Sequence, residues 1–360
     1  MRVRHILLLA AAAALLYLFA LPSARPFASF TAEPPAALPA ALAADGRLDE
    51  LRRFTTIAEG PEDVAVDAGG HLYTGTADGT LWTLPPDRQM GDWRPITLTY
   101  GRPLGLAFGP ADRWLYVADA EQGLMRTDKE GHLEQIVGEY EGRDLGLVDD
   151  LDVSPDGVVY FTSATTAYGL DDYEGAILAH DRTGRLYAYD TRDKSLSVVL
   201  DGLAFPNGVA VAPDGSAVYV ALTADYAVLR VPLNRDGAPR AERFAERLPG
   251  FPDGLSFDDA GRLWVSLVAP RSSVLDALTD RPVLRQAIHR VPEGFKPRPD
   301  ERSSLLALDD DGVVVDRLGF SGEMRERDKP YRSITNAVWR GDTLYVGSLT
   351  ERAVGYYVRP

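Results

Sequence analysis

The stretch "GPEDVAVDAGGHLYTGT", residues 60–76, decides the fold, because its pattern returns five more times along the chain. Each copy joins a short alternating apolar segment, a turn that contains glycine, and a second apolar segment with an aromatic residue. Alternation with a period of two is typical of strands, and glycine turns connect them. The further copies are "RPLGLAFGPADRWLYVAD" (102–119), "VDDLDVSPDGVVYFTS" (148–163), "FPNGVAVAPDGSAVYVA" (205–221), "FPDGLSFDDAGRLWVS" (251–266) and "SITNAVWRGDTLYVGS" (333–348).

The spacing of the copies predicts a β-propeller. Equivalent positions in the first five copies lie 42 to 58 residues apart, and further strand-like segments such as "TLWTL" (80–84) follow them. Four short strands in a unit of roughly 40–45 residues are typical of a propeller blade. We therefore expect residues 51–360 to form one all-β domain, a six-bladed β-propeller. A β-sandwich is the alternative, but a sandwich does not repeat one phrase at a near-constant period.

The last interval of the repeat is longer than the others. It contains "SSVLDALTDRPVLRQAIHR", residues 272–290, whose apolar residues have helical spacing. This predicts a helical insertion near 270–300 and not a missing blade.

The N-terminal 24 residues resemble a membrane-targeting segment. Basic residues precede an unbroken apolar run from Ile6 to Leu21. As a helix this run would be about 24 Å long, somewhat shorter than a hydrocarbon core of roughly 30 Å. Residues 1–24 are thus either a signal-anchor or a cleaved signal peptide. The first predicts a single-pass membrane protein with the propeller on the exported side, periplasmic or extracellular, and the second a secreted protein. Residues 25–50, rich in Pro and Ala, are expected to form a semi-rigid linker.

Composition excludes several classes of function. The net charge is −15, with 53 acidic and 38 basic side chains, so nucleic acid is not expected as a partner. The chain has no cysteine, which excludes thiol nucleophiles, zinc–thiolate sites and disulfides. This balance suits a cation or a small-molecule substrate.

Four polar residues stand at one equivalent position in the repeat: Glu62, Asp149, Asn207 and Asp253. In a propeller the innermost strands surround the axis, so equivalent residues of different blades converge there. Carboxylates about 5 Å apart repel by roughly 3 kcal/mol per pair at an effective dielectric near 20, so they need protons or a cation. Oxygen ligands without His or Cys favour calcium. The alternative is that each side chain only caps its own turn.

These motifs also give the chain a family likeness. The phrases "GPEDVAVD", "RPLGLAF", "DDLDVSPDG", "FPNGVAVAPDG" and "LPGFPDG", in this order, resemble the strictosidine synthase-like and adipocyte plasma membrane-associated protein family. That family belongs to a propeller superfamily with the gluconolactonases and paraoxonases. The resemblance implies a six-bladed propeller with calcium at its centre, and hydrolysis of lactones or aryl esters in several relatives.

The resemblance also implies roles for single residues. Glu62 matches the family's first-blade glutamate ligand, Asn207 the asparagine of its "PNG" motif, and Asp253 the aspartate of "PDG". Asp149 stands where many relatives have asparagine. In the last blade the condensing synthases use a glutamate, whereas "SITNAVW" offers only Thr335 or Asn336.

Three functions follow as hypotheses. The first is a membrane-tethered, calcium-dependent hydrolase of lactones or aryl esters, in which Asp253 or Asp150 activates water. Arg271, Thr335 and Asn336 are its expected substrate-binding residues. The second is a non-catalytic binding propeller stabilised by calcium. The third, a condensing enzyme, is disfavoured because the last blade lacks the glutamate.

Overall fold

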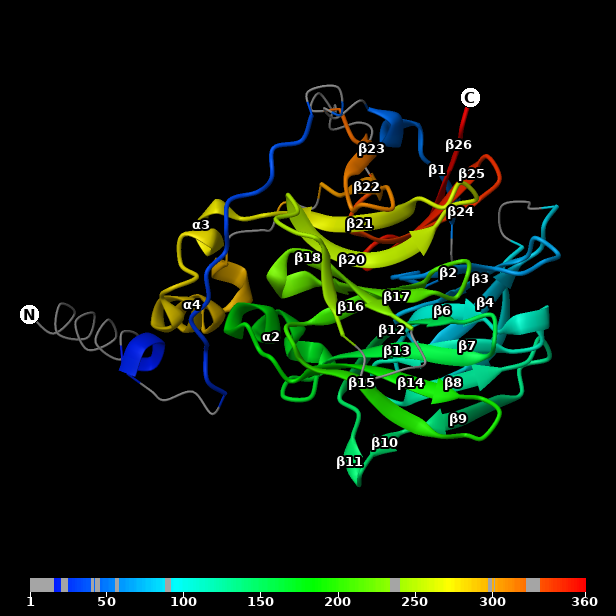
Figure 1. Ribbon diagram of the computed structural model, residues 1–360, viewed down its shortest axis with the longest axis horizontal. Coiled ribbons are helices and arrows are strands. Elements are labelled where there is room, and N and C mark those ends of the chain that lie inside the picture. Colours follow the sequence, from blue (N-terminus) through cyan, green and yellow to red (C-terminus); the bar gives the residue numbers. More distant parts are fainter. Residues whose placement is uncertain are drawn as a thin grey trace, which may run out of the picture.

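Six antiparallel four-stranded sheets surround a common axis in the computed structural model of the 360-residue chain (Figure 1). The sequence-based prediction of an all-β six-bladed propeller is thereby confirmed. The structure describes residues 16–20, 25–39, 42, 46–55, 58–87, 92–233, 240–296, 300, 302–321 and 331–360.

The blades follow one another along the chain, with four consecutive strands in each of the first five. Blade 1 has β2 (Val64–Val66), β3 (Leu72–Gly75), β4 (Thr80–Leu84) and β5 (Arg94–Leu98). Blade 2 has β6 (Pro103–Phe108), β7 (Leu115–Asp119), β8 (Gly123–Thr127) and β9 (Leu133–Val137). Blade 3 has β12 (Leu147–Val153), β13 (Val158–Thr165), β14 (Gly184–Asp190) and β15 (Leu196–Leu203).

The second half of the chain continues this order. Blade 4 has β16 (Pro206–Val211), β17 (Ala217–Leu222), β18 (Ala227–Pro232) and β19 (Glu242–Ala245). Blade 5 has β20 (Gly250–Phe257), β21 (Leu263–Pro270), β22 (Ser304–Leu308) and β23 (Val314–Gly319). Blade 6 has β24 (Ile334–Arg340), β25 (Thr343–Ser348), β26 (Ala353–Val358) and, from the N-terminal side of the domain, β1 (Arg52–Thr55).

The ring closes through both ends of the domain. β1 pairs antiparallel with β26, so blade 6 is assembled from the two ends of the repeat region. The first strands of the blades contact each other in the order β2, β6, β12, β16, β20 and β24, and β24 contacts β2 again. These six strands are therefore the innermost ones and surround the axis.

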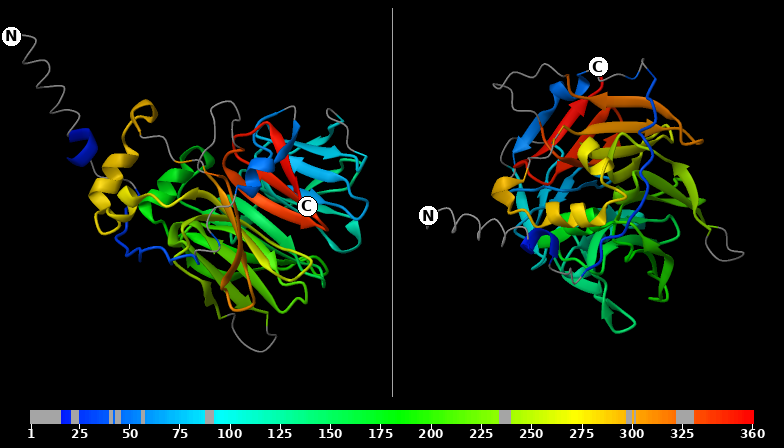
Figure 2. Two further views of the ribbon diagram at one scale, coloured as in Figure 1. Left: turned by 90° about the horizontal axis from the view of Figure 1, so that it is seen from above. Right: turned by 90° about the vertical axis from the view of Figure 1, so that its left-hand side faces the viewer.

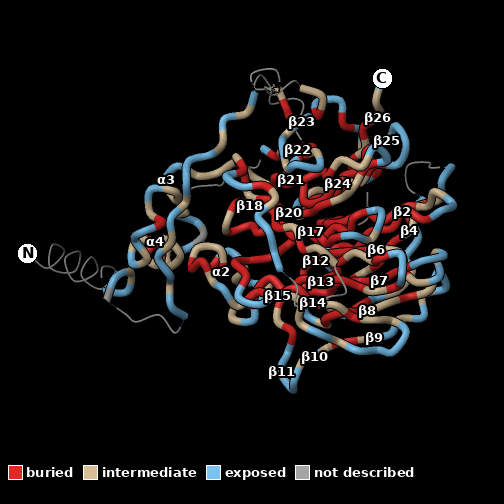
Figure 3. The backbone as a smooth tube through the Cα atoms, viewed as in Figure 1, coloured by how far each residue is buried: buried red, intermediate tan, exposed pale blue. Residues whose placement is uncertain are grey.

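The core lies between neighbouring blades, where each sheet buries both faces (Figure 3). Large side chains fill these spaces, as where Trp264 of blade 5 meets Trp339 of blade 6 with ring centroids 5.5 Å apart. The aromatic residue of each repeat copy therefore serves packing between blades.

Short helices follow the second strands of several blades. η5 (Leu170–Asp172) and α2 (Tyr173–Ala179) connect β13 to β14, and η6 (Thr223–Asp225) connects β17 to β18. The insertion lies inside blade 5, between β21 and β22, and contains α3 (Ser273–Asp276), α4 (Pro282–His289) and η7 (Glu293–Phe295). The remaining short elements are η3 (Arg47–Glu50), η4 (Pro110–Asp112) and a hairpin of β10 (Glu139–Tyr140) and β11 (Arg143–Asp144).

One face of the propeller carries all of α2, α3 and α4. Leu147, the first residue of β12, pairs with Thr165 at the end of β13, and Gly250 pairs with Pro270 in the same way. Helices that follow a second strand thus lie where the innermost strands begin. We call this side the entrance face; the two further views show the helices gathered on it (Figure 2).

The N-terminal region is only partly described. The apolar run of residues 6–21 lies largely outside the described residues, except for η1 (Leu16–Ala20). Within the described part, no helix is long and apolar enough to span a bilayer.

Residues 25–39, which we call the strap, run along the entrance face (Figure 2). The amide of Ala28 donates to Ala179 of α2 at 2.9 Å, and that of Ala36 to Arg247 of blade 4 at 2.8 Å. The described part of the expected linker is therefore attached to the propeller surface and does not stand away from it as a stalk.

Candidate functional site

Three of the four polar repeat positions, Asp149, Asn207 and Asp253, lie at a common irregularity of the innermost strands. In blade 3 the pairing passes from Val148 opposite Ser163 to Leu151 opposite Phe161, so two residues on β12 face one on β13. The same two-against-one step occurs at 207–208, 253–254 and 335–336. This is a β-bulge, which re-aims side chains locally.

The bulges fix the alignment of the last blade. Thr335 occupies the position of Asp149, Asn207 and Asp253, and Asn336 occupies that of Asp150. Of the two residues that the sequence offered for the last blade, Thr335 is therefore the equivalent of the ligand positions. In blade 1 the matching pair, Glu62 and Asp63, directly precedes β2.

The first residue of each bulge pair is buried near the axis. Glu62, Asp149, Asn207 and Asp253 are between 5% and 8% exposed. Burial, followed by the charges of Asp253 and Asp149, raises the pKa of Glu62 well above its usual value. Carboxylates from blades 1, 3 and 5 thus lie close enough to disfavour one another's ionisation.

Burial also raises the pKa of the other two carboxylates. Burial raises the pKa of Asp149 to about 7. Burial and the charge of Asp149 raise the pKa of Asp253, while a hydrogen bond from Asn207 opposes the increase. Asn207 and Asp253 come from adjacent blades. All four residues that the sequence nominated as ligands are therefore buried on the innermost side of their blades, and their role as metal ligands stays a prediction.

The second residue of each pair points towards the next blade instead. The carboxylate of Asp63 accepts the amide of Leu106 in β6 at 2.7 Å, and that of Asp150 accepts the amide of Val209 in β16 at 2.9 Å. A second oxygen of Asp150 accepts the amide of Leu151 at 2.8 Å. These contacts join adjacent innermost strands and argue against Asp150 as the catalytic carboxylate.

Where this second residue is glycine, the next blade comes too close for a side chain. A Cβ on Gly254 would lie 2.7 Å from the carbonyl oxygen of Thr335 and 2.8 Å from Asn336. The "PNG" and "PDG" motifs therefore combine one polar residue directed at the axis with one glycine that admits the neighbouring strand.

Thr335 and Asn336 are also engaged within the protein. The hydroxyl of Thr335 donates to the carbonyl of Glu62 at 2.5 Å. The Asn336 amide donates to Asp63 and accepts the amide of Ala337 at 2.7 Å. Their polar atoms position the ligand strands, so the structure gives them a different role from the expected contact with substrate.

One buried charged residue, Arg102, was not predicted from the sequence to be part of the site. Arg102, 6% exposed, donates to the carbonyl of Gly60 at 2.8 Å. Its charge lowers the pKa of Glu62, although less than burial and the other carboxylates raise it. The signal lay in "RPLGLAF", where Arg102 comes two residues before Leu104, which stands in the second repeat copy at the position that Asp149 has in the third.

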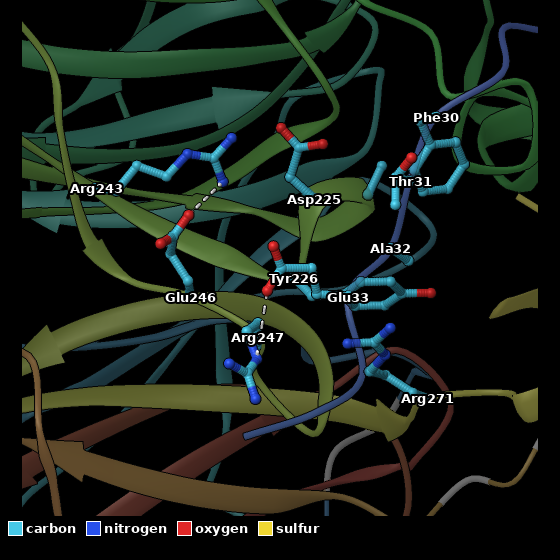
Figure 4. A pocket seen from close by; sticks show the side chains of 11 residues that line it. Phe30, Thr31, Ala32, Glu33, Asp225, Tyr226, Arg243, Glu246, Arg247 and Arg271 are labelled. Carbon is cyan, nitrogen blue, oxygen red and sulfur yellow. Dashed lines mark ion pairs between the residues drawn. The ribbon is translucent and has the colours of Figure 1, made fainter.

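Arg271 lies away from the four axial residues. Its Nε donates to Asp276 at 3.0 Å, and its guanidinium lies 4.0 Å from the ring centre of Tyr226. It lines a surface pocket of about 220 Å³ between the strap and blades 4 and 5 (Figure 4). The pocket's walls include Phe30, Glu33, Arg243 and Arg247, with the ion pairs Arg243–Glu246 and Arg247–Glu33 at 3.2 and 3.8 Å.

His180, the buried histidine of the entrance face, contacts the strap. His180 Nε2 lies 2.8 Å from Asp225, and Phe30 of the strap stacks on the imidazole with ring centres 3.8 Å apart. His289 of α4 lies 2.7 Å from Asp172. Each imidazole thus pairs with a carboxylate outside the axial group.

The axial residues fit a calcium ion by their chemistry. Three carboxylates and one carboxamide supply hard oxygen donors, and the raised pKa values show that the nearby Arg102 does not neutralise them. Among the described residues, no group of three or more His, Asp or Glu side chains is already arranged as a metal cage. A cation would therefore also need the amide oxygen of Asn207 and further oxygens from water or substrate.

The fold and these residues define a class: a six-bladed propeller with buried acids at its axis. The chain belongs to the strictosidine synthase-like family, as the sequence resemblance predicted. Residues 149–234 match the strictosidine synthase model and residues 41–84 the strictosidine synthase-like N-terminal model.

Full-length relatives support this membership. Adipocyte plasma membrane-associated protein of Danio rerio is 34% identical over 291 residues, which are 73% of this chain and 68% of the relative. Protein STRICTOSIDINE SYNTHASE-LIKE 10 of Arabidopsis thaliana is 32% identical over 326 residues, which are 84% of this chain and 86% of the relative.

Solved structures share the fold at lower identity. A gluconolactonase from Xanthomonas campestris superimposes with a TM-score of 0.62 at 21% identity, covering 94% of this chain and 100% of that one. Regucalcin from Agrobacterium tumefaciens, described as a calcium-binding protein, gives 0.59 at 18% identity, covering 94% and 95%. At these identities the likeness shows the fold alone.

Proposed function

We propose that the protein is a calcium-dependent hydrolase of lactones or aryl esters, held at a membrane by its N-terminal segment. One observation carries the proposal. Carboxylates from three blades are buried near the axis; burial raises the pKa of each, and the charge of Asp149 raises those of Glu62 and Asp253 further. A fold that gathers uncompensated charge at one point is suited to binding a divalent ion there.

Glu62, Asp149, Asn207 and Asp253 would hold the calcium ion. When bound, it would supply Lewis acidity towards an ester or lactone carbonyl. Thr335 fixes the Glu62 backbone through its hydroxyl, and Thr162 does the same for Asn207 by donating to its carbonyl at 2.7 Å. These contacts keep the ligand set in place without using its side-chain oxygens.

Asp253 is the proposed base. Its side chain is next to Asn207, whose hydrogen bond orients the carboxylate. Because Asp150 accepts backbone amides with both oxygens, Asp253 is the better of the two candidates for accepting a proton from water. The small-molecule substrate would reach it from the entrance face, where the innermost strands begin.

The membrane part of the proposal rests on two supports. The chain carries the apolar run of residues 6–21, and the similar proteins of fish and mammals are named as plasma membrane-associated. The propeller would lie on the exported side, since basic residues precede the apolar run.

A calcium-stabilised binding propeller is the second candidate. It is favoured by the low exposure of the four axial residues and by the use of Asp150, Thr335 and Asn336 in internal hydrogen bonds. A condensing enzyme is disfavoured, since Thr335 fills the sixth axial position without an acidic side chain.

The deciding experiment combines metal content with turnover. Purified full-length protein is analysed for calcium, and hydrolysis of phenyl acetate and a panel of lactones is measured with and without chelator. Hydrolysis that chelator abolishes and added calcium restores supports the enzyme. Stoichiometric calcium with no turnover of any substrate establishes the binding propeller, and absence of calcium binding refutes both.

A further inference from the structure

The insertion of blade 5 forms a helical cap on the entrance face. We use this name for residues 273–295, which include α3, α4 and η7. The cap begins after Pro270, at the edge of blade 5 where β20 and its bulge at Asp253 begin. The cap and the axial acids therefore share one side of the molecule.

Helix α4 buries one charged side chain and exposes one apolar side chain, although its Ala287 is buried. Arg285 points inward and is 2% exposed; its guanidinium donates to the carbonyls of Leu278, at 3.1 Å, Leu178 and Ala28. Val283, on the same helix, is 53% exposed. Surface helices of soluble domains normally turn their charged residues to water and their apolar residues inward.

Other apolar side chains of the cap are exposed as well. Val274 of α3 is 62% exposed and Phe295 of η7 is 84% exposed. The other large apolar side chains exposed in the described propeller strands and loops occur in ones or twos on separate blades. A concentration of this kind on one face marks an interaction surface.

The chain itself indicates what this surface meets. η1, the described end of the N-terminal apolar run, lies against α4, where Arg290 donates to the carbonyls of Tyr17 at 3.0 Å and Leu18 at 3.3 Å. Leu16, Tyr17 and Phe19 are exposed next to the cap. The most apolar stretch of the sequence thus ends at the same patch.

We propose that the outer face of the helical cap lies in the surface of a lipid bilayer, so that the entrance face is turned towards the membrane. The inference rests on the proposed membrane association and adds the orientation. The inward Arg285 holds α4 to the strap and to α2, while Val274, Val283 and Phe295 enter the headgroup region, as apolar faces of interfacial helices do.

Site-specific labelling tests this orientation, because the chain has no cysteine to compete. Single substitutions Val274→Cys, Val283→Cys and Phe295→Cys are labelled with an environment-sensitive fluorophore. The full-length protein is reconstituted into phosphatidylcholine vesicles that contain lipids with nitroxide-labelled chains. Val313→Cys is the matched control: Val313 is 57% exposed in the turn between β22 and β23, at the opposite edge of blade 5.

We expect the three cap labels to be quenched at least about twofold more strongly than the label at 313, with blue-shifted emission. Equal quenching at all four sites overturns the proposal. The proposal is also overturned if the cap labels become protected from solvent in lipid-free detergent as the protein concentration rises. That result would show that a second copy of the chain covers the cap. The readout needs no turnover, so a failed hydrolase assay leaves this test intact.

Discussion

At the scale of single residues, the axial acids lower the stability of the fold by charge repulsion and at the same time provide ligands for a cation. If ionised, carboxylates buried near one another repel by on the order of a few kcal/mol per pair, a large part of the usual net stability of about 5–15 kcal/mol. The protein reduces this by holding protons, since burial raises the pKa of Asp149 to about 7. Calcium would replace those protons, so pH and calcium should act on one group of residues.

Stability without metal should therefore fall as the pH rises. An unfolded Asp149 ionises near 3.8 and the folded one near 7, so the folded state binds the extra proton between these values. The calcium-free protein should lose stability between about pH 4 and pH 7 through this group. Thermal unfolding across that range, with Asp149→Asn as comparison, measures the contribution. A variant with an unchanged slope would show that Asp149 does not titrate this way.

Asp253 and Asp150 should respond differently to the same isosteric change. Asp253→Asn removes a ligand charge and should lower calcium affinity by at least about tenfold. Asp150→Asn leaves the axis intact but removes a carboxylate that accepts amides of two strands, and should lower stability by about 1–3 kcal/mol. Calorimetric titration with calcium and denaturant unfolding separate the effects. Equal losses of affinity would place Asp150 among the ligands.

At the scale of elements, the strap joins parts of the entrance face that are distant in the sequence. Phe30 stacks on His180 at the end of α2, and Arg285 of α4 lies 5.0 Å from the Phe30 ring. The strap also bonds to Arg247 of blade 4. It connects α2, the cap and blade 4 with few residues.

Removing the Phe30 ring should loosen these helices without opening the propeller. The ring is half-buried, so Phe30→Ala should cost about 1–2 kcal/mol. Amide exchange should become faster in α2 and α4 and stay unchanged in the innermost strands. Ala32→Gly, at a strap position beside the pocket, is the control for backbone freedom alone. Faster exchange throughout β12 or β16 would mean that the strap supports the whole ring.

The sequence allowed the blades to be predicted, because each carries one phrase with strand alternation and a glycine turn. The convergence of Glu62, Asn207 and Asp253 could also be expected, since equivalent residues face one axis. The repeat alignment assigned Asp149, and not Asp150, to the axial position, but that Asp150 bonds to β16 of the next blade could not be predicted, because this contact depends on the bulge in the pairing of β12 with β13. The strap has no periodic pattern, and its place depends on single contacts such as Phe30 on His180.

At the scale of the whole molecule, the orientation of the entrance face bears on the choice of substrate. If the helical cap lies in the bilayer surface, the path to Asp253 begins among lipid headgroups. Esters and lactones that partition into membranes would then be concentrated at the entrance, whereas water-soluble ones would gain nothing from the membrane.

Turnover should therefore depend on both lipid and chain length. We expect reconstitution into vesicles to raise kcat/KM for long-chain lactones by at least about tenfold over detergent micelles, with little change for phenyl acetate, as the buried acyl carbons add about 0.8 kcal/mol each to partitioning. Val283→Asp with Phe295→Asp should remove the gain and leave phenyl acetate hydrolysis unchanged, because both side chains are exposed on the helical cap and neither is one of the buried axial residues. An equal gain for both substrates would instead indicate that the membrane merely stabilises the fold, and loss of activity towards both would place the cap inside the catalytic site.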